Sequence, residues 1–231
     1  METLEAYQEG KVLLIDKPLN WTSFQVVNKI RWLIKQQFGI KKIKVGHAGT
    51  LDPLATGLLI LCTGKFTKKI ETYQAQIKEY TGIITLGTTT PSYDLETEVD
   101  QTFDISGITE EDIQDNTKHF IGEIQQQPPI FSALKKEGKR LYEYAREGEK
   151  VEIPKRTITI SEFEITKIDL PNVEFRAVCS KGTYIRSLAY DFGKSLNNGA
   201  HLSALRRTKI GEFSIEDALG VLEFEEAFKA N

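Results

Sequence analysis

The stretch from Gly46 to Gly57, GHAGTLDPLATG, places three glycines and an Asp-Pro step between a helical pattern and an apolar strand pattern. Glycine is favoured where the backbone turns tightly or is approached closely, so this stretch is predicted to be a structured loop. Between Lys17 and Ile70 there are ten Lys or Arg residues and a single acid, Asp52, inside the loop. Nearby cations keep a carboxylate ionised and attract polyanions. Asp52 therefore either starts a turn or acts on a nucleic acid.

Hydrophobic periodicity predicts the elements on both sides of this loop. Thr22 and Gln25 form a capping-box pattern, followed by apolar residues at helical spacing as far as Phe38. Residues 58–62 form an apolar run of strand length, and residues 77–86 alternate so that the tyrosine at position 80 falls on the apolar side. Further strands are expected at 11–16, 157–168 and 173–180, and helices at 66–73, 109–121 and 183–196, with residues 199–208 leading to a last helix from Ser214. Because these elements do not alternate regularly, the predicted fold class is α+β with a mixed sheet.

The length of 231 residues suits one large domain, or a domain with a lobe, and residues 125–156 are the candidate for an inserted lobe. No apolar run reaches the length of a membrane span, and the N-terminus lacks a signal-peptide pattern, so a cytoplasmic protein is expected. Cys62 and Cys179 lie in apolar surroundings, which favours buried free thiols. The three histidines show no ligand spacing, so no metal site is expected.

Charge is segregated along the chain although the net charge is only −3. Residues 93–115 contain nine acids and no Lys or Arg, whereas residues 176–209 contain seven basic residues and one acid. Together with residues 17–70, the second basic segment could form a cationic face for a nucleic acid on an otherwise acidic protein. The alternative is that these basic residues only cover solvated surfaces.

Candidate catalytic groups follow from what the sequence lacks as well as from what it contains. There is no phosphate-binding loop or dinucleotide fingerprint, and no second carboxylate lies close to Asp52 in the sequence, which favours a lone nucleophilic aspartate. Tyr80 could stack on an everted base or simply pack in the core. Arg186, in the segment KGTYIR, could hold the Asp52 carboxylate, contact a phosphate or lie on the surface. His47 could be a base, an RNA contact or a loop residue.

Six segments in one order resemble the TruB family of tRNA pseudouridine synthases. They are the KPLNWTS segment from Lys17, GHAGTLDPLATG, Lys78-Glu79-Tyr80, residues 127–146 from QPPIFSALK onward, CSKGTYIRSLAYDFG from Cys179, and GAHLSALRRTKIGEFS from Gly199. This resemblance implies the pseudouridine synthase fold, with a mixed, mostly antiparallel central sheet flanked by helices. It also implies isomerisation of the uridine at position 55, in the T loop of tRNA, without metal or cofactor.

The resemblance assigns roles by motif position. Asp52 would be the nucleophile, Tyr80 would stack on the target uracil and help remove its C5 proton, and Arg186 would be the ion-pair partner of Asp52. His47 would fill the space left by the flipped nucleotide. Tyr184 and Leu205 would line the uracil pocket.

The resemblance also sets the expected partners and domains. We expect a monomeric enzyme acting on the T stem-loop of tRNA with no membrane and no obligatory protein partner, a single catalytic domain over residues 1–231, and no C-terminal RNA-binding domain of the PUA type. Two other functions fit the same residues: an RNA-binding module that folds tRNA, and a guide-RNA-dependent synthase like dyskerin.

Overall fold

The computed structural model describes residues 3–149 and 151–229. The chain divides into two compact units, which are described separately: unit 1 comprises Met1–Tyr80 and Leu205–Asn231, and unit 2 comprises Thr81–Ala204. Strands β4 (Lys78–Leu86) and β12 (Ala200–Ile210) have residues in both units. The predicted α+β class with a mixed, mostly antiparallel sheet is confirmed.

Helix α2 (Ser23–Phe38) of unit 1 begins and ends where the sequence predicts. The Thr22 hydroxyl accepts a hydrogen bond from the Gln25 backbone amide at 3.1 Å, and the Gln25 side chain accepts one from the Thr22 amide at 2.7 Å. Such reciprocal bonds satisfy amides that have no partner inside the helix. Gly39 closes the helix in the left-handed conformation, at φ 62°.

In unit 1 the main sheet follows the hydrogen-bonded order β14-β1-β3-β12, with β2 paired to β3 and β13 paired to β12. Strand β1 runs antiparallel to β3, whereas β14 is parallel to β1 and β12 is parallel to β3. The bounds of the strands not yet given are β1 Val12–Lys17, β2 Val45–His47, β3 Ala55–Thr63, β13 Phe213–Ser214 and β14 Leu219–Gly220.

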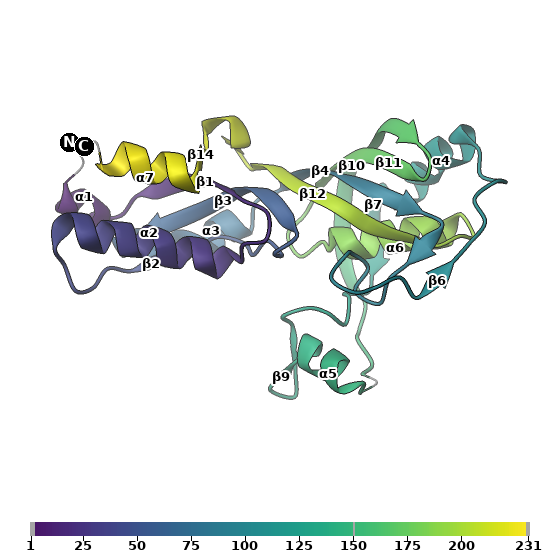
Figure 1. Ribbon diagram of the computed structural model, residues 1–231, viewed down its shortest axis with the longest axis horizontal. Helices are drawn as coiled ribbons and strands as arrows, with labels where there is room; N and C mark the ends of the chain where they lie inside the picture. The colour runs from purple at the N-terminus through teal and green to yellow at the C-terminus, as the bar shows by residue number, and fades with distance from the viewer. Residues whose placement is uncertain (1–2, 150, 230–231) are drawn as a thin grey trace. The chain divides into compact units, whose positions relative to one another are not determined.

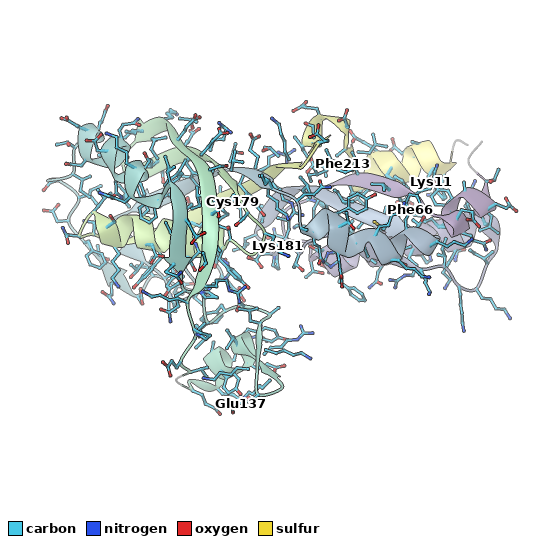
Figure 2. All side chains as sticks on the ribbon, turned by 180° about the vertical axis from the view of Figure 1, so that it is seen from behind. Lys11, Phe66, Glu137, Cys179, Lys181 and Phe213 are labelled. Atoms are coloured by element: carbon cyan, nitrogen blue, oxygen red, sulfur yellow. The ribbon has the colours of Figure 1, made fainter. Side chains whose placement is uncertain are left out.

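Strand β3 is buried on both faces, so its side chains feed two hydrophobic clusters. Leu59 and Leu61 pack with α2, with Tyr7 of α1 (Leu4–Glu9) and with α7 (Val221–Lys229). On the other face, Leu58, Ile60 and Cys62 pack against the 3₁₀ helix η1 (Gly64–Lys69) and helix α3 (Ile70–Gln74). Figure 1 shows α2 and α7 along one side of this sheet. Figure 2 labels Phe66 and Phe213, which pack on the second cluster. Each fully buried leucine contributes roughly 1.5–3 kcal/mol, so β3 anchors unit 1.

In unit 2 the same sheet follows the order β4-β11-β10-β7 and is antiparallel at β11-β10 and β10-β7. It contains β7 (Gly122–Gln126), β10 (Arg156–Asp169) and β11 (Asn172–Cys179), so the two long strands expected here are confirmed. The helices of this unit beside the sheet are α4 (Glu110–Asn116), the 3₁₀ helix η2 (Thr117–Phe120) and α6 (Ile185–Ser195). Four phenylalanines join these elements with ring centroids 5.6–6.1 Å apart: Phe120, Phe163, Phe175 and Phe192.

Two small hairpins complete unit 2. Strands β5 (Thr88–Thr89) and β6 (Gln101–Thr102) pair within the acidic segment. Strands β8 (Lys135–Lys136) and β9 (Lys139–Arg140) pair next to helix α5 (Leu141–Glu147) in the segment predicted to be a lobe. Figure 1 shows this segment projecting from the rest of unit 2, and Figure 2 places Glu137 at its tip.

Two expectations near the C-terminus were wrong. Residues 199–208, expected as a connection, lie almost entirely in the long strand β12. The last helix begins at Val221 rather than Ser214, because the Ser214 hydroxyl caps only the single turn η3 (Ile215–Asp217). The Glu223 carboxylate instead accepts the Gly220 amide at 2.7 Å, at the start of the real helix.

Both cysteines are buried, as expected, and neither forms a disulfide among the described residues. Burial raises the pKa of the Cys62 thiol to about 11.

Within the described residues, no helix is long and apolar enough to cross a bilayer. In the same residues, no group of three His, Cys, Asp or Glu side chains is placed to hold a metal ion.

Candidate functional site

The Asp52 loop, residues 48–54, connects the antiparallel strands β2 and β3. Its backbone turns at the aspartate, where the Ala55 amide donates to the Asp52 carbonyl at 3.0 Å. Ser23, at the first position of α2, accepts the Leu51 amide at 2.8 Å and donates to the Leu51 carbonyl at 3.0 Å. The residue before Asp52 is therefore fixed, while Asp52 itself is half-buried.

Lys17 is completely buried next to this loop. Its ammonium group donates to the carbonyls of Pro18 at 2.9 Å, Trp21 at 2.6 Å and Pro53 at 3.4 Å. Burial lowers the pKa of Lys17 to about 8, opposed by the Asp52 carboxylate and reinforced by the Arg207 cation. Lys17 therefore ties the turn that follows β1 to Pro53, the residue after Asp52.

Arg207 is a second buried cation at the loop, with 1% of its surface exposed. Its Nε donates to the Leu58 carbonyl at 2.8 Å and its Nη2 to the Gly49 carbonyl at 3.1 Å, so it joins the start of the loop to strand β3. Sequence reasoning gave Arg207 and Lys17 no role of their own. The sequence pattern does not show which of the adjacent arginines 206 and 207 is buried. Arg206 forms a half-exposed ion pair with Asp16 at 2.6 Å.

Three other predicted site residues lie in unit 1. His47 ends β2, and burial together with the Arg207 cation lowers its imidazole pKa, so it is neutral near pH 7. Leu205 opposes Ala55 in the β12-β3 pair, directly after the Asp52 loop. Tyr80 lies on the buried side of β4 with 8% of its surface exposed, as the alternation predicts.

Arg186 lies in unit 2 and is 5% exposed. Its guanidinium donates to the carbonyls of Ser92 at 3.2 Å and Phe131 at 2.9 Å, and its Nε lies 3.5 Å from Oδ2 of Asp94. The Asp94 carboxylate also accepts the Glu96 amide at 3.0 Å. Sequence reasoning counted Asp94 only as one of nine acids and missed it as a buried ion-pair partner. The predicted pairing of Arg186 with Asp52 stays a prediction.

Tyr184 precedes helix α6 in unit 2 and is held through its backbone. Its amide donates to the buried Gln126 side chain at 2.8 Å, and the same side chain donates to the Tyr184 carbonyl at 3.0 Å. The Arg156 guanidinium lies 5.8 Å from the centre of the Tyr184 ring. A partly exposed ring with a fixed backbone is suited to contact a planar ligand.

The chemistry available is therefore that of a carboxylate on a fixed loop with two buried cations beside it. Such an arrangement can present Asp52 to an electrophile without moving the backbone. The buried Arg186 supplies a guanidinium of defined orientation in unit 2.

Comparison with known proteins gives the same family over both parts of the chain. Residues 35–185 match the model of the TruB family pseudouridylate synthase N-terminal domain, and residues 186–231 match the tRNA pseudouridylate synthase B C-terminal domain. The tRNA pseudouridine synthase B of Flavobacterium johnsoniae is 63% identical and covers 98% of this chain and 100% of its own length. That of Phocaeicola vulgatus is 56% identical and covers 95% and 94%.

Solved structures agree on the fold. A chain of a Cbf5-Nop10-Gar1 complex superposes with a TM-score of 0.72 at 30% identity and covers 95% of this chain. A chain of an H/ACA RNP bound to a substrate RNA containing 2′-deoxyuridine gives a TM-score of 0.71 at 27% identity. This chain spans 54% and 55% of those two chains.

Proposed function

The chain belongs to the TruB family of pseudouridylate synthases, and on that basis we propose that it modifies a uridine in the T loop of tRNA with Asp52 as the nucleophile. The reaction itself follows from the family and from relatives that match nearly the whole chain: the protein isomerises uridine to pseudouridine in tRNA. This requires cleavage of the bond from C1′ to N1, rotation of the uracil, and formation of a bond from C1′ to C5. No atom is gained or lost.

Asp52 is the group that starts this exchange. Its carboxylate attacks the base or the sugar, or removes a proton so that a glycal forms. The observation that carries the proposal is the fixed conformation of the Asp52 loop, which Ser23, Lys17 and Arg207 hold through hydrogen bonds to its backbone. A nucleophile held in this way needs little reorganisation when the substrate binds.

The other residues bind and orient the substrate in this proposal. Tyr80 stacks on the everted uracil and helps to remove the C5 proton, while Tyr184 and Leu205 line the uracil pocket. His47, neutral near pH 7, occupies the space that the everted nucleotide leaves. Arg186, oriented by Asp94, is the ion-pair partner of Asp52.

Release of tritium from C5-labelled uridine in a tRNA transcript tests this function. We expect release by the purified chain alone, without added RNA or protein, and loss of release to background in Asp52→Asn. The control is Asp217→Asn, which changes an exposed aspartate of unit 1 in the same way and should keep parental activity.

The same assay separates the other two functions. Binding of tRNA without tritium release by the parent protein would indicate a tRNA-folding module. Release that depends on an added guide RNA would indicate a guide-dependent synthase. Activity retained in Asp52→Asn would refute the assignment of the nucleophile.

A further inference from the structure

A cationic groove lies in unit 1, outside the Asp52 loop. It has a volume of about 930 Å³. One wall carries Arg31 and Lys35 of α2, and the connection from α2 to β2 adds Lys41, Lys42 and Lys44. Lys65 and Lys68 of η1 complete it. None of the described residues that line this groove is acidic.

The backbone under the groove is fixed by specific bonds. Arg31 donates through Nη2 to the Val45 carbonyl at 2.9 Å, which joins α2 to β2. The Gly64 amide donates to the Lys44 carbonyl at 2.9 Å, which joins the lysine-rich connection to the start of η1. The walls therefore have a defined geometry, because hydrogen bonds tie the lysine-rich connection to the neighbouring elements.

The charge of the groove is poorly compensated within the protein. In the described part of the chain, Lys65 forms an ion pair with Glu9 at 2.7 Å, whereas no ion pair joins the other six groove cations to an acid. Six like charges around one cavity repel one another, and a bound polyanion would relieve that repulsion. Unit 1 as a whole has 16 Lys and Arg residues against 13 Asp and Glu residues, whereas unit 2 has 14 against 20.

The groove and the Asp52 loop lie at the two ends of strand β2. Lys44, Val45 and Gly46 line the groove, and the next residue, His47, leads into the loop. At roughly 3.3 Å per residue, Lys44 lies about 10 Å from His47 along the strand. An RNA whose loop reaches Asp52 could therefore continue past β2 into the groove.

We propose that this groove binds the phosphate backbone of the double-helical stem that continues from the T loop of the substrate tRNA. The inference rests on the proposed function, because it takes the T loop to be the RNA segment at Asp52. It assigns to the groove a sequence-independent contact that contributes to affinity and not to chemistry. Lysine and arginine contacts to phosphates position an RNA without reading its bases.

Two T-loop hairpins test the proposal, one with a short stem and one whose stem is extended to the length of the T arm stacked on the acceptor arm. In Lys41→Gln/Lys42→Gln, affinity for the long hairpin should fall about tenfold near 0.1 M salt, and the salt slope of log K should become shallower by about 1–2. Affinity for the short hairpin should change less than twofold. The single-turnover rate at saturating RNA should be unchanged for both.

The control is Lys118→Gln/Lys167→Gln, which removes the same charge from exposed, ion-paired lysines of unit 2 and should leave both affinities unchanged. A second variant, Lys35→Gln/Lys68→Gln, should reproduce the groove effect from other parts of the wall.

Three results would overturn the inference: equal losses for the two hairpins, no loss for either, or an equal loss in the control. If the parent releases tritium from tRNA and the groove variants bind normally, only this inference fails. If the parent releases none, the proposed function fails.

Discussion

At the scale of single residues, the Asp52 loop depends on two cations that the protein buries. Lys17 and Arg207 direct their hydrogen bonds to backbone carbonyls: Lys17 to those of Pro18, Trp21 and Pro53, and Arg207 to those of Gly49 and Leu58. A buried cation is tolerated when hydrogen bonds replace the water that it loses. Removing either side chain removes a donor from these carbonyls, and the loss should reach Asp52 through the loop.

Arg207→Met should lower the free energy of unfolding by about 2–4 kcal/mol, because two carbonyls lose their donor. Activity should fall at least tenfold in kcat with little change in tRNA affinity, and Arg207→Lys should recover part of both losses. Urea denaturation and single-turnover assays measure the two effects. Arg206→Met is the control and should cost less than about 1 kcal/mol, since its ion pair with Asp16 is partly exposed. Equal effects of the two substitutions would contradict the role given to Arg207.

Lys17 should make stability depend on pH in the alkaline range. Its pKa is about 8 in the folded protein, against 10.5 for an unperturbed lysine. Between these values the unfolded chain binds more protons, so unfolding becomes less favourable as pH rises. Relative to Lys17→Met, the parent should gain up to about 3 kcal/mol of unfolding free energy between pH 8 and pH 10.5. Denaturant titrations of both proteins across this range measure the gain, and a constant difference would argue against a depressed pKa.

At the scale of the elements, strands β3 and β12 approach so closely that glycine is required at position 57. A Cβ built on Gly57 would lie 2.3 Å from the Arg207 carbonyl oxygen, and the Gly57 φ of 104° is unfavourable for any other residue. The backbone contact therefore excludes a side chain at the point where the Asp52 loop enters β3.

Gly57→Ala should destabilise the protein by more than about 3 kcal/mol and reduce kcat, because the strands must separate next to the loop. Gly39→Ala is a matched control: this glycine also has a positive φ, of 62°, but no atom lies within 4 Å of its Cβ position. We expect that control to cost about 1 kcal/mol. Chemical denaturation compares the two, and similar losses would show that backbone conformation alone explains the requirement.

Short sequence patterns predicted the elements that are determined by interactions between residues close together in the chain. Thr22 and Gln25 gave the start of α2, and the alternation around Tyr80 gave the buried face of β4. Strand β12 was missed because its pattern contains Arg207, which reads as a surface residue although hydrogen bonds to carbonyls bury it. The last helix was placed too early because Ser214 is a true cap, but of one turn only.

At the scale of the whole molecule, the proposed catalytic groups are divided between the units. Asp52, Tyr80, His47 and Leu205 belong to unit 1, and Arg186 and Tyr184 belong to unit 2. The motifs assign roles to all six, and these roles stay predictions. Sequence could not supply Asp94, because ion-pair partners distant in the chain leave no spacing signal. The pairing of Arg186 with Asp52 stays a prediction.

Asp94→Asn tests the contribution of unit 2. The amide keeps an acceptor for the Glu96 amide but removes the charge that faces Arg186, so the guanidinium should lose its orientation. We expect kcat to fall by about tenfold or more while the Kd for tRNA changes less than threefold. Asp100→Asn, in the same acidic segment, should leave kcat near the parental value. A loss confined to tRNA affinity would contradict an orienting role.

The hydrogen bonds from Ser23 to both backbone groups of Leu51 order the Asp52 loop before the RNA binds. Because the start of a long helix immobilises this peptide, the conformational entropy of the loop is lost when the chain folds and not when RNA arrives. Association with tRNA should then be limited by unstacking of the target nucleotide in the RNA. Hydrogen exchange at the Leu51 amide should accordingly be slow in the free enzyme and little altered by substrate.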